Sequence, residues 1–382
     1  MLAKDNPSLL LSEAKGLSFT SIPTPTITDP YDVIVRIGQT GICGSDVHYW
    51  QRGRIGDFVL TSPIVLGHES AGIVSAIGSS VRNICVGDRV AIEPGVPCRH
   101  CDNCRSGSYN LCADTVFAAT PPHHGTLSSY YKTAADYCYR LPDHLTLEDG
   151  ALCEPVAVAV QICKVGNVRA GQTVVVFGCG PIGLLVQSVA KAHGVKRVIG
   201  IDMSEKRMRM AKEVMRCADD VFTPPQNPAK SGNVNDESAW SANVAAQIKE
   251  RFELGEGPDV VIDATGAESC IQTGVHLCKK GGTYVQAGMR RENVVFPITT
   301  ACIRELTIRG SIRYTAGVYP MAIDLVASSK IDPKVLITHR YPFERAKEAF
   351  ETVRRGGEDV LKVMIEGVLD EVHDTTSLCN GA

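Results

Sequence analysis

The chain reads TVVVFGCGPIG from Thr173 to Gly183, and this stretch decides the fold. Its first five residues, Thr173–Phe177, are all β-branched or aromatic, which predicts a buried strand. A G-x-G-x-x-G motif follows at once, and an apolar periodicity typical of a helix continues from Ile182 to His193. The motif comprises Gly178, Gly180, Pro181, Ile182 and Gly183. Strand, glycine turn and helix in this order predict a dinucleotide-binding unit.

The residues around the motif predict NAD as the cofactor. Glycines permit the tight turn and the close approach of a pyrophosphate, and the helix N-terminus offers free N–H groups to that anion. The next predicted strand ends at Asp202, whose carboxylate can accept hydrogen bonds from the adenosine ribose and would repel the 2′-phosphate of NADP. Arg207 follows five residues later, at the adenosine end or as an exposed helix residue. A glycine turn with a capping aspartate is the alternative, which the flanking strand and helix disfavour.

Strands and helices alternate through the rest of this region, which is typical of a parallel sheet. Amphipathic stretches such as Glu205–Val214 separate the strands, whereas the polar stretch Pro224–Asn243 shows no apolar periodicity and is predicted to be a surface loop. The further predicted strands are Val198–Ile201, Val260–Asp263, Thr283–Ala287 and Thr307–Ile308. Residues 157–312 are therefore predicted to form an α/β domain with a doubly wound parallel sheet.

The remaining residues predict a second domain of a different kind. Residues 1–156 are rich in Gly and Pro and contain short β-type runs at Val33–Ile37 and Ile73–Ile77. After Tyr314 the pattern predicts a return to this domain, so that it comprises residues 1–156 and 313–382. That return is predicted to contain a helix at Met321–Ser329, a strand at Val335–Thr338, a helix at Phe343–Arg355 and a loose tail beyond Gly367.

Composition limits the classes of function. A length of 382 residues suits two domains, and a net charge of −3 gives no basic surface for a nucleic acid. The N-terminus lacks a secretory apolar region, and the longest apolar run is interrupted by glycines, so neither export nor a membrane span is expected. A cytoplasmic location is predicted. The 15 cysteines are then expected to serve metal binding or burial rather than disulfides.

Four of the cysteines have the spacing of a metal site. They are Cys98, Cys101, Cys104 and Cys112, in the pattern C-x2-C-x2-C-x7-C. Four thiolates can close a tetrahedral zinc site that leaves no position for a substrate, so a structural zinc lobe is predicted over residues 95–113. An iron–sulfur cluster is the main alternative, and a chance grouping of buried cysteines is a weaker one.

A second group of residues has the ligand types of a reactive metal. Cys43 lies upstream of the adjacent pair His68 and Glu69. Three protein ligands plus water describe a catalytic zinc rather than a structural one. Taken singly, each residue is more often a core thiol, a turn histidine or a solvated acid.

The surrounding residues connect these motifs to a known family. Gly67-His68-Glu69, followed by Gly72, Gly78 and Val81, matches the signature G-H-E-x2-G-x5-G-x2-V and resembles the zinc-containing medium-chain alcohol dehydrogenases. With Cys43, the four-cysteine lobe and the dinucleotide motif in family order, the resemblance covers about residues 30 to 366. It implies a GroES-like irregular β domain for catalysis and a Rossmann domain for NAD.

Within the family the chain looks closest to the sorbitol and xylitol dehydrogenases. The similar motifs are Val47-His48-Tyr49-Trp50, Arg54-Ile55-Gly56-Asp57-Phe58 and Cys153-Glu154-Pro155. This resemblance implies that Cys43, His68 and Glu69 bind the catalytic zinc, with Glu154 at or near it. It further implies a proton relay through Ser45 and His48, an Asp46 that holds the ring of His68, and assembly as a homotetramer or homodimer. The residues implied to line the substrate pocket are Tyr49, Phe117, Arg313 and Tyr314.

The expected reaction is therefore zinc-dependent, NAD-linked oxidation of a polyol to a ketose, either xylitol to D-xylulose or sorbitol to fructose. L-Arabinitol 4-dehydrogenase activity, or oxidation of threonine or another secondary alcohol, uses the same apparatus and stays open. Arg313 and Tyr314 favour a polyhydroxy chain over a simple alcohol, because both can donate hydrogen bonds to it. A zinc-stabilised binding protein is the alternative that involves no catalysis.

Overall fold

The computed structural model describes residues 5–12, 16–226 and 234–368. The chain divides into two compact units, each of which is described separately below. The first unit comprises Met1–Pro155, Thr315–Ser329 and Pro333–Ala382, and the second comprises Val156–Tyr314 and Lys330–Asp332. The predicted tail beyond Gly367 lies almost wholly outside the described residues.

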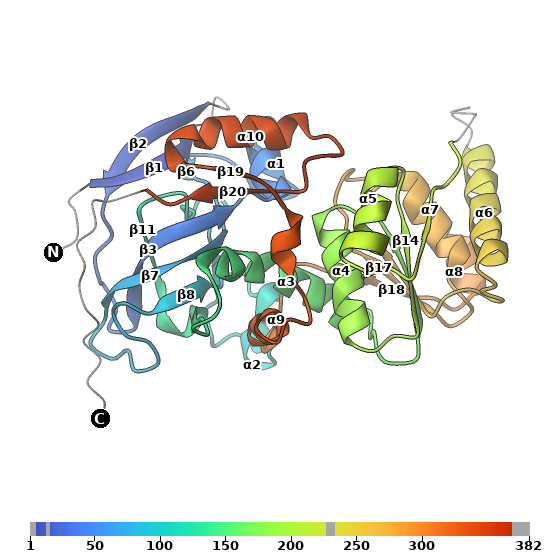
Figure 1. The fold of residues 1–382 in the computed structure, drawn as a ribbon, viewed down its shortest axis with the longest axis horizontal. Coiled ribbons are helices and arrows are strands. Elements are labelled where there is room, and N and C mark those ends of the chain that lie inside the picture. Colours follow the sequence, from blue (N-terminus) through green and yellow to red (C-terminus); the bar gives the residue numbers. More distant parts are fainter. Residues whose placement is uncertain (1–4, 13–15, 227–233, 369–382) are drawn as a thin grey trace. The chain divides into compact units, whose positions relative to one another are not determined.

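The second unit is a parallel sheet of six strands (Figure 1). In sheet order the strands are β15 (Asp220–Phe222), β14 (Arg197–Ile201), β13 (Thr173–Phe177), β16 (Val260–Asp263), β17 (Thr283–Gln286) and β18 (Thr307–Gly310). This is the doubly wound order 3-2-1-4-5-6, with the fold-deciding strand β13 near the middle. Helices on both faces bury β13, which is why its sequence is apolar without alternation.

The helices of this unit cover the two faces of the sheet. One core joins the sheet to helices α6 (Val234–Arg251), α7 (Glu268–Leu277) and α8 (Ile298–Ile303). Helix α4 (Pro181–Ala192) lies on the opposite face and is followed by α5 (Glu205–Arg209) and a π-helical turn, Met210–Val214. The longest apolar run is thus divided between β13 and α4. No helix among the described residues is long and apolar enough to cross a membrane.

Two predictions for this unit were incomplete. Strand β15 is only three residues long, too short for a periodicity to be recognised. The expected loop Pro224–Asn243 is wrong for its second half, because α6 begins at Val234. The buried face of α6 runs through Ser241, Val244, Ala245 and Ile248 and lies mostly beyond the polar stretch that suggested a loop. Residues 227–233 lie outside the described part.

The first unit is built mainly on antiparallel strands. Its seven-stranded sheet has the order β12-β8-β7-β3-β20-β19, with β11 also paired to β3. These strands are β3 (Asp32–Gly41), β7 (Glu69–Ile77), β8 (Arg89–Ile92), β11 (Tyr130–Ala134), β12 (Cys138–Arg140), β19 (Ile337–Tyr341) and β20 (Lys362–Glu366). A three-stranded sheet adds β2 (Leu17–Pro23), β1 (Asp5–Leu11) and β6 (Ile64–Val65). The chain therefore returns to this unit at its C-terminal side, where β20 pairs with β3.

Short helices and hairpins complete the first unit. They are α1 (Gly44–Arg52), the hairpin β4 (Arg54–Ile55) with β5 (Phe58–Val59), the pair β9 (Gly95–Val96) and β10 (Val116–Phe117), α2 (Asp102–Arg105), α9 (Val318–Ala327) and α10 (Ala346–Arg355). Helix α1 packs on α10, where the rings of Trp50 and Phe350 meet edge to face at 6.1 Å. The same core includes Leu9 of the three-stranded sheet and Val363 of β20, so it joins both sheets of the unit.

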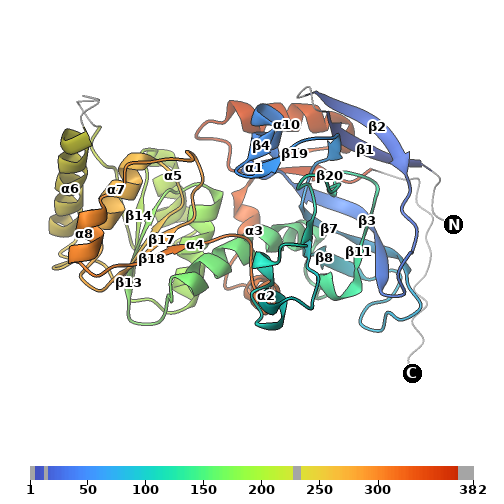
Figure 2. The same cartoon turned by 180° about the vertical axis from the view of Figure 1, so that it is seen from behind.

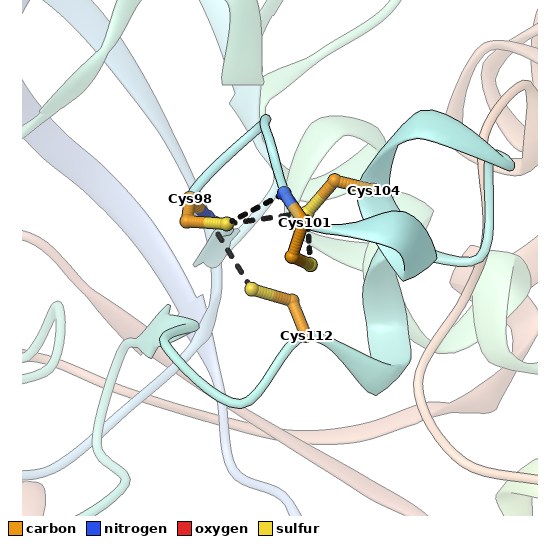
Figure 3. A group of neighbouring side chains, drawn as sticks. All are labelled: Cys98, Cys101, Cys104 and Cys112. Carbon is orange, nitrogen blue, oxygen red and sulfur yellow. Dashed lines mark hydrogen bonds between the residues drawn. The ribbon is translucent and has the colours of Figure 1, made fainter.

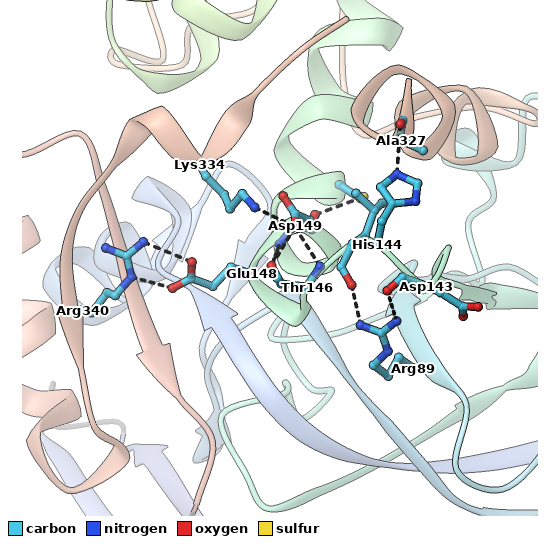
Figure 4. Close-up of polar contacts among 11 residues, drawn as sticks. Arg89, Asp143, His144, Thr146, Glu148, Asp149, Ala327, Lys334 and Arg340 are labelled. Atoms are coloured by element: carbon cyan, nitrogen blue, oxygen red, sulfur yellow. Dashed lines mark hydrogen bonds and ion pairs between the residues drawn. The ribbon is translucent and has the colours of Figure 1, made fainter. Parts of the chain in front are cut away.

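Helix α3 (Leu147–Val165) begins in this unit, and its first turn is held by a polar network (Figure 4). The Asp149 carboxylate accepts hydrogen bonds from the backbone N–H and the hydroxyl of the capping residue Thr146, as the third helical residue of a capping box does, and pairs with Lys334 at 3.0 Å. Glu148 accepts two hydrogen bonds from Arg340. The returning segment thereby fixes the start of the helix that carries Glu154.

Candidate metal centre and cofactor site

Three predicted ligands meet at the edge where β3 and β7 pair. Cys43 directly precedes α1, and Glu69 opens β7 opposite Gly41 of β3. One ligand atom from each of Cys43, His68 and Glu69 lies within 4.8 Å of the others. A thiolate, an imidazole and a carboxylate at this spacing suit zinc, and three protein ligands leave a fourth position for a substrate. The residues present therefore fit the expected catalytic metal.

Asp46 organises this group from behind, as expected. Its carboxylate is 1% exposed, and one oxygen accepts a hydrogen bond from the backbone N–H of Cys43 at 3.1 Å. The other oxygen accepts one from the backbone N–H of Gly67 at 3.2 Å and lies 3.4 Å from Nδ1 of His68. Because Nδ1 faces Asp46, Nε2 of His68 is left to face a metal. Burial by itself lowers the pKa of His68, but Asp46 and Cys43 together raise it well above its usual value.

Glu69 has a partner that sequence reasoning missed. Both of its oxygens accept hydrogen bonds from the ammonium of Lys362 on β20, at 2.8 and 2.6 Å. Burial lowers the pKa of Lys362, but the charges of Glu69, Cys43 and Glu154 outweigh that effect and raise it. Gly41 makes room for the pair, since a Cβ there would lie 2.3 Å from Oε2 of Glu69. The sequence offered one signal for this pair, because Lys362 is a charged residue at the start of the otherwise apolar run Lys362–Ile365.

The structure places the remaining predicted residues of this site as follows. Ser45 contacts His68, with its Oγ 3.4 Å from Nε2. His48 is half-buried on α1, and burial together with the nearby Arg52 lowers its pKa. Glu154 is buried on α3, close enough to Lys362 for its charge to act on the ammonium, but it is not in the three-residue metal group.

The residues expected to line the substrate pocket divide between the two units. Phe117 is buried, and its ring centre lies 5.9 Å from that of His68. Tyr49 is buried on α1. Arg313 and Tyr314 belong to the second unit, where Tyr314 is buried and Arg313 adopts a positive φ of 49°.

The four cysteines of the predicted lobe converge on one point (Figure 3). Sγ of Cys104 lies 3.8 Å from that of Cys98 and 3.4 Å from that of Cys101. Sulfurs bound tetrahedrally to one zinc are about 3.8 Å apart. The spacing thus fits a single ion that all four sulfurs contact, whereas thiolates that hold a cluster bind different irons. Backbone N–H groups also donate to Cys98 and Cys112, as expected for anionic sulfurs.

A buried acid that sequence reasoning missed attaches this lobe to the sheet. Glu93 follows β8 and accepts hydrogen bonds from the hydroxyls of Tyr109, in the lobe, and Tyr139, on β12, at 2.5 and 2.7 Å. Burial raises the pKa of Glu93 to about 7, although the two phenols oppose the shift. The lobe is therefore fixed by side-chain bonds as well as by its own sulfurs.

In the second unit the glycine motif has the backbone that a dinucleotide requires. Gly178 has a φ of 99°, and a Cβ on Gly183 would lie 1.9 Å from the carbonyl oxygen of Gly178. A Cβ on Gly180 would meet nothing within 4 Å, which leaves open the approach to the N-terminus of α4. Pro181 is the first residue of that helix, with Ile182 behind it.

Asp202 lies where β14 ends, beside this turn. One carboxylate oxygen accepts a hydrogen bond from the backbone N–H of Cys179 at 2.7 Å, and the other accepts one from Ser204 at 2.9 Å. Asp202 thereby ties the glycine turn to the start of α5, which carries Arg207. The acid and the turn are together, as a ribose next to a pyrophosphate requires.

Comparisons with known proteins agree with this geometry. Residues 29–143 match the family described as alcohol dehydrogenase GroES-like domain, and residues 181–328 match that described as zinc-binding dehydrogenase. The chain is 48% identical over 365 residues to the probable D-xylulose reductase A of Aspergillus clavatus. The aligned region covers 96% of this chain and 98% of that protein. It is 47% identical over 363 residues to D-xylulose reductase A of Aspergillus niger, with 95% and 97% covered.

Solved structures are similar over nearly the whole chain. An Escherichia coli oxidoreductase of unknown specificity superposes with a TM-score of 0.84 at 31% identity, covering 95% of this chain and 99% of that one. L-Idonate 5-dehydrogenase from Escherichia coli gives 0.82 at 28% identity, covering 95% and 98%. The predicted α/β fold and the predicted family are thus confirmed. This chain belongs to the zinc-binding, medium-chain alcohol dehydrogenase family.

Proposed function

We propose that this enzyme oxidises a polyol to a ketose with zinc and NAD, and that xylitol, giving D-xylulose, is its substrate. The observation that carries the proposal is the convergence of Cys43, His68 and Glu69, a ligand set with a position left for a substrate oxygen. The relatives named D-xylulose reductase support xylitol in particular. The first unit then acts as the catalytic domain, and its bounds are close to the predicted residues 1–156 and 313–382. The second unit acts as the NAD-binding domain, close to the predicted residues 157–312.

Each proposed residue has a defined task. Zinc in this site would polarise a bound hydroxyl and lower its pKa. Ser45 and His48 are proposed to carry away the proton released by the substrate, as members of a relay. Burial and the nearby Arg52 lower the pKa of His48. Asp46 holds His68 in the ring orientation that a metal needs. Tyr49, Phe117, Arg313 and Tyr314 are proposed to bind the polyol chain, and Glu154 to act beside the metal.

The cofactor residues follow the same division. We infer that Gly178, Gly180, Pro181, Ile182 and Gly183 bind the pyrophosphate of NAD. Asp202 accepts hydrogen bonds from the adenosine ribose, and Arg207 lies at the adenosine end. A solved relative from Escherichia coli, 28% identical with a TM-score of 0.82, holds NADH, which supports this cofactor. Thirteen of the described cysteines are free thiols, which supports the reducing cytoplasm as the location. Cys85 is disulfide-bonded, so the expectation that the cysteines serve only metal binding or burial is wrong for this residue.

The test is NADH formation at saturating NAD from xylitol, sorbitol, L-arabinitol, threonine and 2-butanol, with zinc content measured on the same protein. We expect two zincs per chain and the highest kcat/KM with xylitol. A preference for L-arabinitol or sorbitol would retain the polyol class and replace the named substrate. No turnover of any alcohol by protein with two zincs would favour a zinc-stabilised binding protein.

Asp202→Ala is expected to lower kcat/KM for NAD about tenfold to a hundredfold, because a charged hydrogen bond to the ribose is lost. The discrimination against NADP should fall as well, since the repelling charge is gone. Asp202→Asn is the matched control, because it removes the charge and can still hydrogen-bond. Steady-state kinetics with both cofactors measure the effect, and an unchanged NAD to NADP ratio in both variants would remove Asp202 from the ribose contact.

We further propose that the enzyme is a homo-oligomer, a dimer or a tetramer, that uses the β18 side of the second unit. Strand β18 is the last in sheet order, and all four of its residues are exposed. Strand β18 and helix α8 are drawn in orange in Figure 2. Large apolar side chains lie exposed on both, among them Ile298, Ile303 and Ile308. Exposed apolar side chains beside a sheet edge suit the same surface of a second copy.

Ile303→Glu should shift the protein toward the monomer, because Ile303 is 76% exposed and a charge there would be buried in the interface. Light scattering after gel filtration measures the mass. Val214→Glu, at an exposed position 56% accessible on the π-helical turn, is the control and should leave the mass unchanged. A monomeric wild-type protein would contradict the oligomer, and an unaffected Ile303→Glu oligomer would contradict the surface.

A further inference from the structure

Lys362 is the only lysine among the described residues that is buried, with 4% of its surface exposed. An ammonium ion costs several kcal/mol to remove from water, so a buried lysine needs a compensating partner. Lys362 has that partner in Glu69, itself 2% exposed. The reaction proposed above assigns Lys362 no task, although its partner is one of the three residues in the metal group.

The geometry saturates the ammonium. An ammonium has three protons to donate. Nζ of Lys362 makes two hydrogen bonds to the Glu69 oxygens, at 2.8 and 2.6 Å, and a third to the carbonyl oxygen of Ile42 at 3.2 Å. Ile42 is the residue before Cys43, so one side chain contacts both Glu69 on β7 and the segment that leads from β3 to Cys43. Lys362 therefore fixes the Glu69 carboxylate in place.

Both oxygens of Glu69 are thus engaged by a cation, although the same carboxylate belongs to the metal group. We propose that Lys362 is a positioning residue that shares the Glu69 carboxylate with the catalytic metal, so that Glu69 binds the metal weakly and a position stays open for substrate. This inference rests on the proposed role of Cys43, His68 and Glu69 as ligands. It assigns the lysine an effect on the strength of metal binding rather than on folding alone.

The sign of the effect follows from the charges. A hydrogen bond from an ammonium withdraws electron density from a carboxylate and makes it a poorer ligand. The ammonium also repels a nearby divalent cation. Without Lys362, the metal is the only cationic partner of Glu69 among these contacts. Both carboxylate oxygens of Glu69 are then available to the metal. Metal binding should then be tighter and the substrate position less open, whereas loss of a merely structural contact would loosen the metal.

Lys362→Met tests this, because methionine keeps the length and apolar stem without the charge. The purified holoenzyme is mixed with a colorimetric zinc chelator, and the release of each zinc is followed over time. We expect the catalytic zinc of the variant to leave about tenfold more slowly than that of the wild type, while kcat falls. In protein reconstituted with cobalt, the visible bands should lose intensity, because a second carboxylate oxygen raises the coordination number.

Three further variants isolate the cause. Lys362→Arg keeps a cation and should stay near the wild-type release rate. Lys334→Met removes the matched lysine that pairs with buried Asp149, away from the metal group, and should leave release and spectrum unchanged. In a Glu69→Gln background, Lys362→Met should slow the release far less than it does in the wild type, since only the direct repulsion between ammonium and metal is then removed.

The outcomes separate this inference from the proposed function. An unchanged zinc content in Cys43→Ser would refute the catalytic zinc itself. Two zincs with equal or faster release from Lys362→Met would overturn the role of Lys362 and leave the metal site standing. If Lys362→Met does not fold, the Glu69→Gln/Lys362→Met protein decides, because it has no orphaned carboxylate and should fold; its failure to fold would also overturn the inference.

Discussion

Cys43→Ser is expected to reduce turnover by a factor of about a thousand or more, because metal-assisted polarisation of the substrate contributes several kcal/mol. A serine hydroxyl does not ionise at neutral pH and cannot replace a thiolate as a zinc ligand. The backbone N–H of residue 43 still donates to Asp46, so the turn before α1 should persist. Zinc content is expected to fall from two per chain to one.

Activity, zinc content and NAD binding measured on the same preparation check this expectation. NAD binding should survive, because the glycine motif and Asp202 belong to the second unit. Cys302→Ser, at an exposed cysteine on α8, is the matched control and should retain both activity and zinc. A Cys43→Ser enzyme with wild-type turnover would refute the catalytic zinc assignment.

Cys101→Ser is expected to have the largest effect on stability. A structural zinc contributes to the free energy of folding directly, and loss of one thiolate typically loses the ion. Apart from the bond from Tyr109 to Glu93, the lobe has few other means of holding its shape, since its helix α2 is four residues long and contains no buried residue. The free energy of unfolding should fall by several kcal/mol, in the range of the largest single-residue effects.

Denaturant unfolding with zinc analysis measures this. One zinc per chain should remain, at Cys43, His68 and Glu69. Cys43→Ser is also expected to retain one zinc per chain, so the two variants differ in their stability and not in their zinc content. Added zinc should not restore the midpoint, because three thiolates do not close the shell. A variant that keeps two zincs and the wild-type midpoint would mean that the four cysteines hold no structural ion.

The sequence was most informative where the signal is local. Strand β13, the glycine turn and α4 are contiguous, and periodicity with glycine placement predicts all three. The four cysteines likewise fall within 15 residues, from Cys98 to Cys112. Helix α6 was missed at its start because its first turns are polar and its buried face begins only near Ser241. The amphipathic stretch Glu205–Val214 is helical throughout but changes from α to π after Arg209.

The candidate site was less predictable where its contacts span the chain. Lys362 and Glu69 are separated by 293 residues, and no spacing rule connects a lysine at that distance to a carboxylate. Glu93 was missed for a similar reason, because its partner Tyr139 lies 46 residues away on another strand. The periodicity of a sequence predicts which face of a strand is buried, but it does not predict which side chains of other strands lie against that face. Only the register of β3 with β7 and β20 shows that Glu69 and Lys362 are neighbours.

The separation of Lys362 from Glu69 also orders the events of biosynthesis. The cysteine lobe is complete once about 112 residues have left the ribosome, so it can take up its ion while translation continues. Strand β20, by contrast, is translated 293 residues after Glu69, and until it docks on β3 the acid has no ammonium beside it. The nascent chain therefore exposes Cys43, His68 and Glu69 unrestrained by Lys362 for most of its synthesis. A metal ion that binds before β20 docks therefore meets a Glu69 carboxylate whose two oxygens are both free of Lys362.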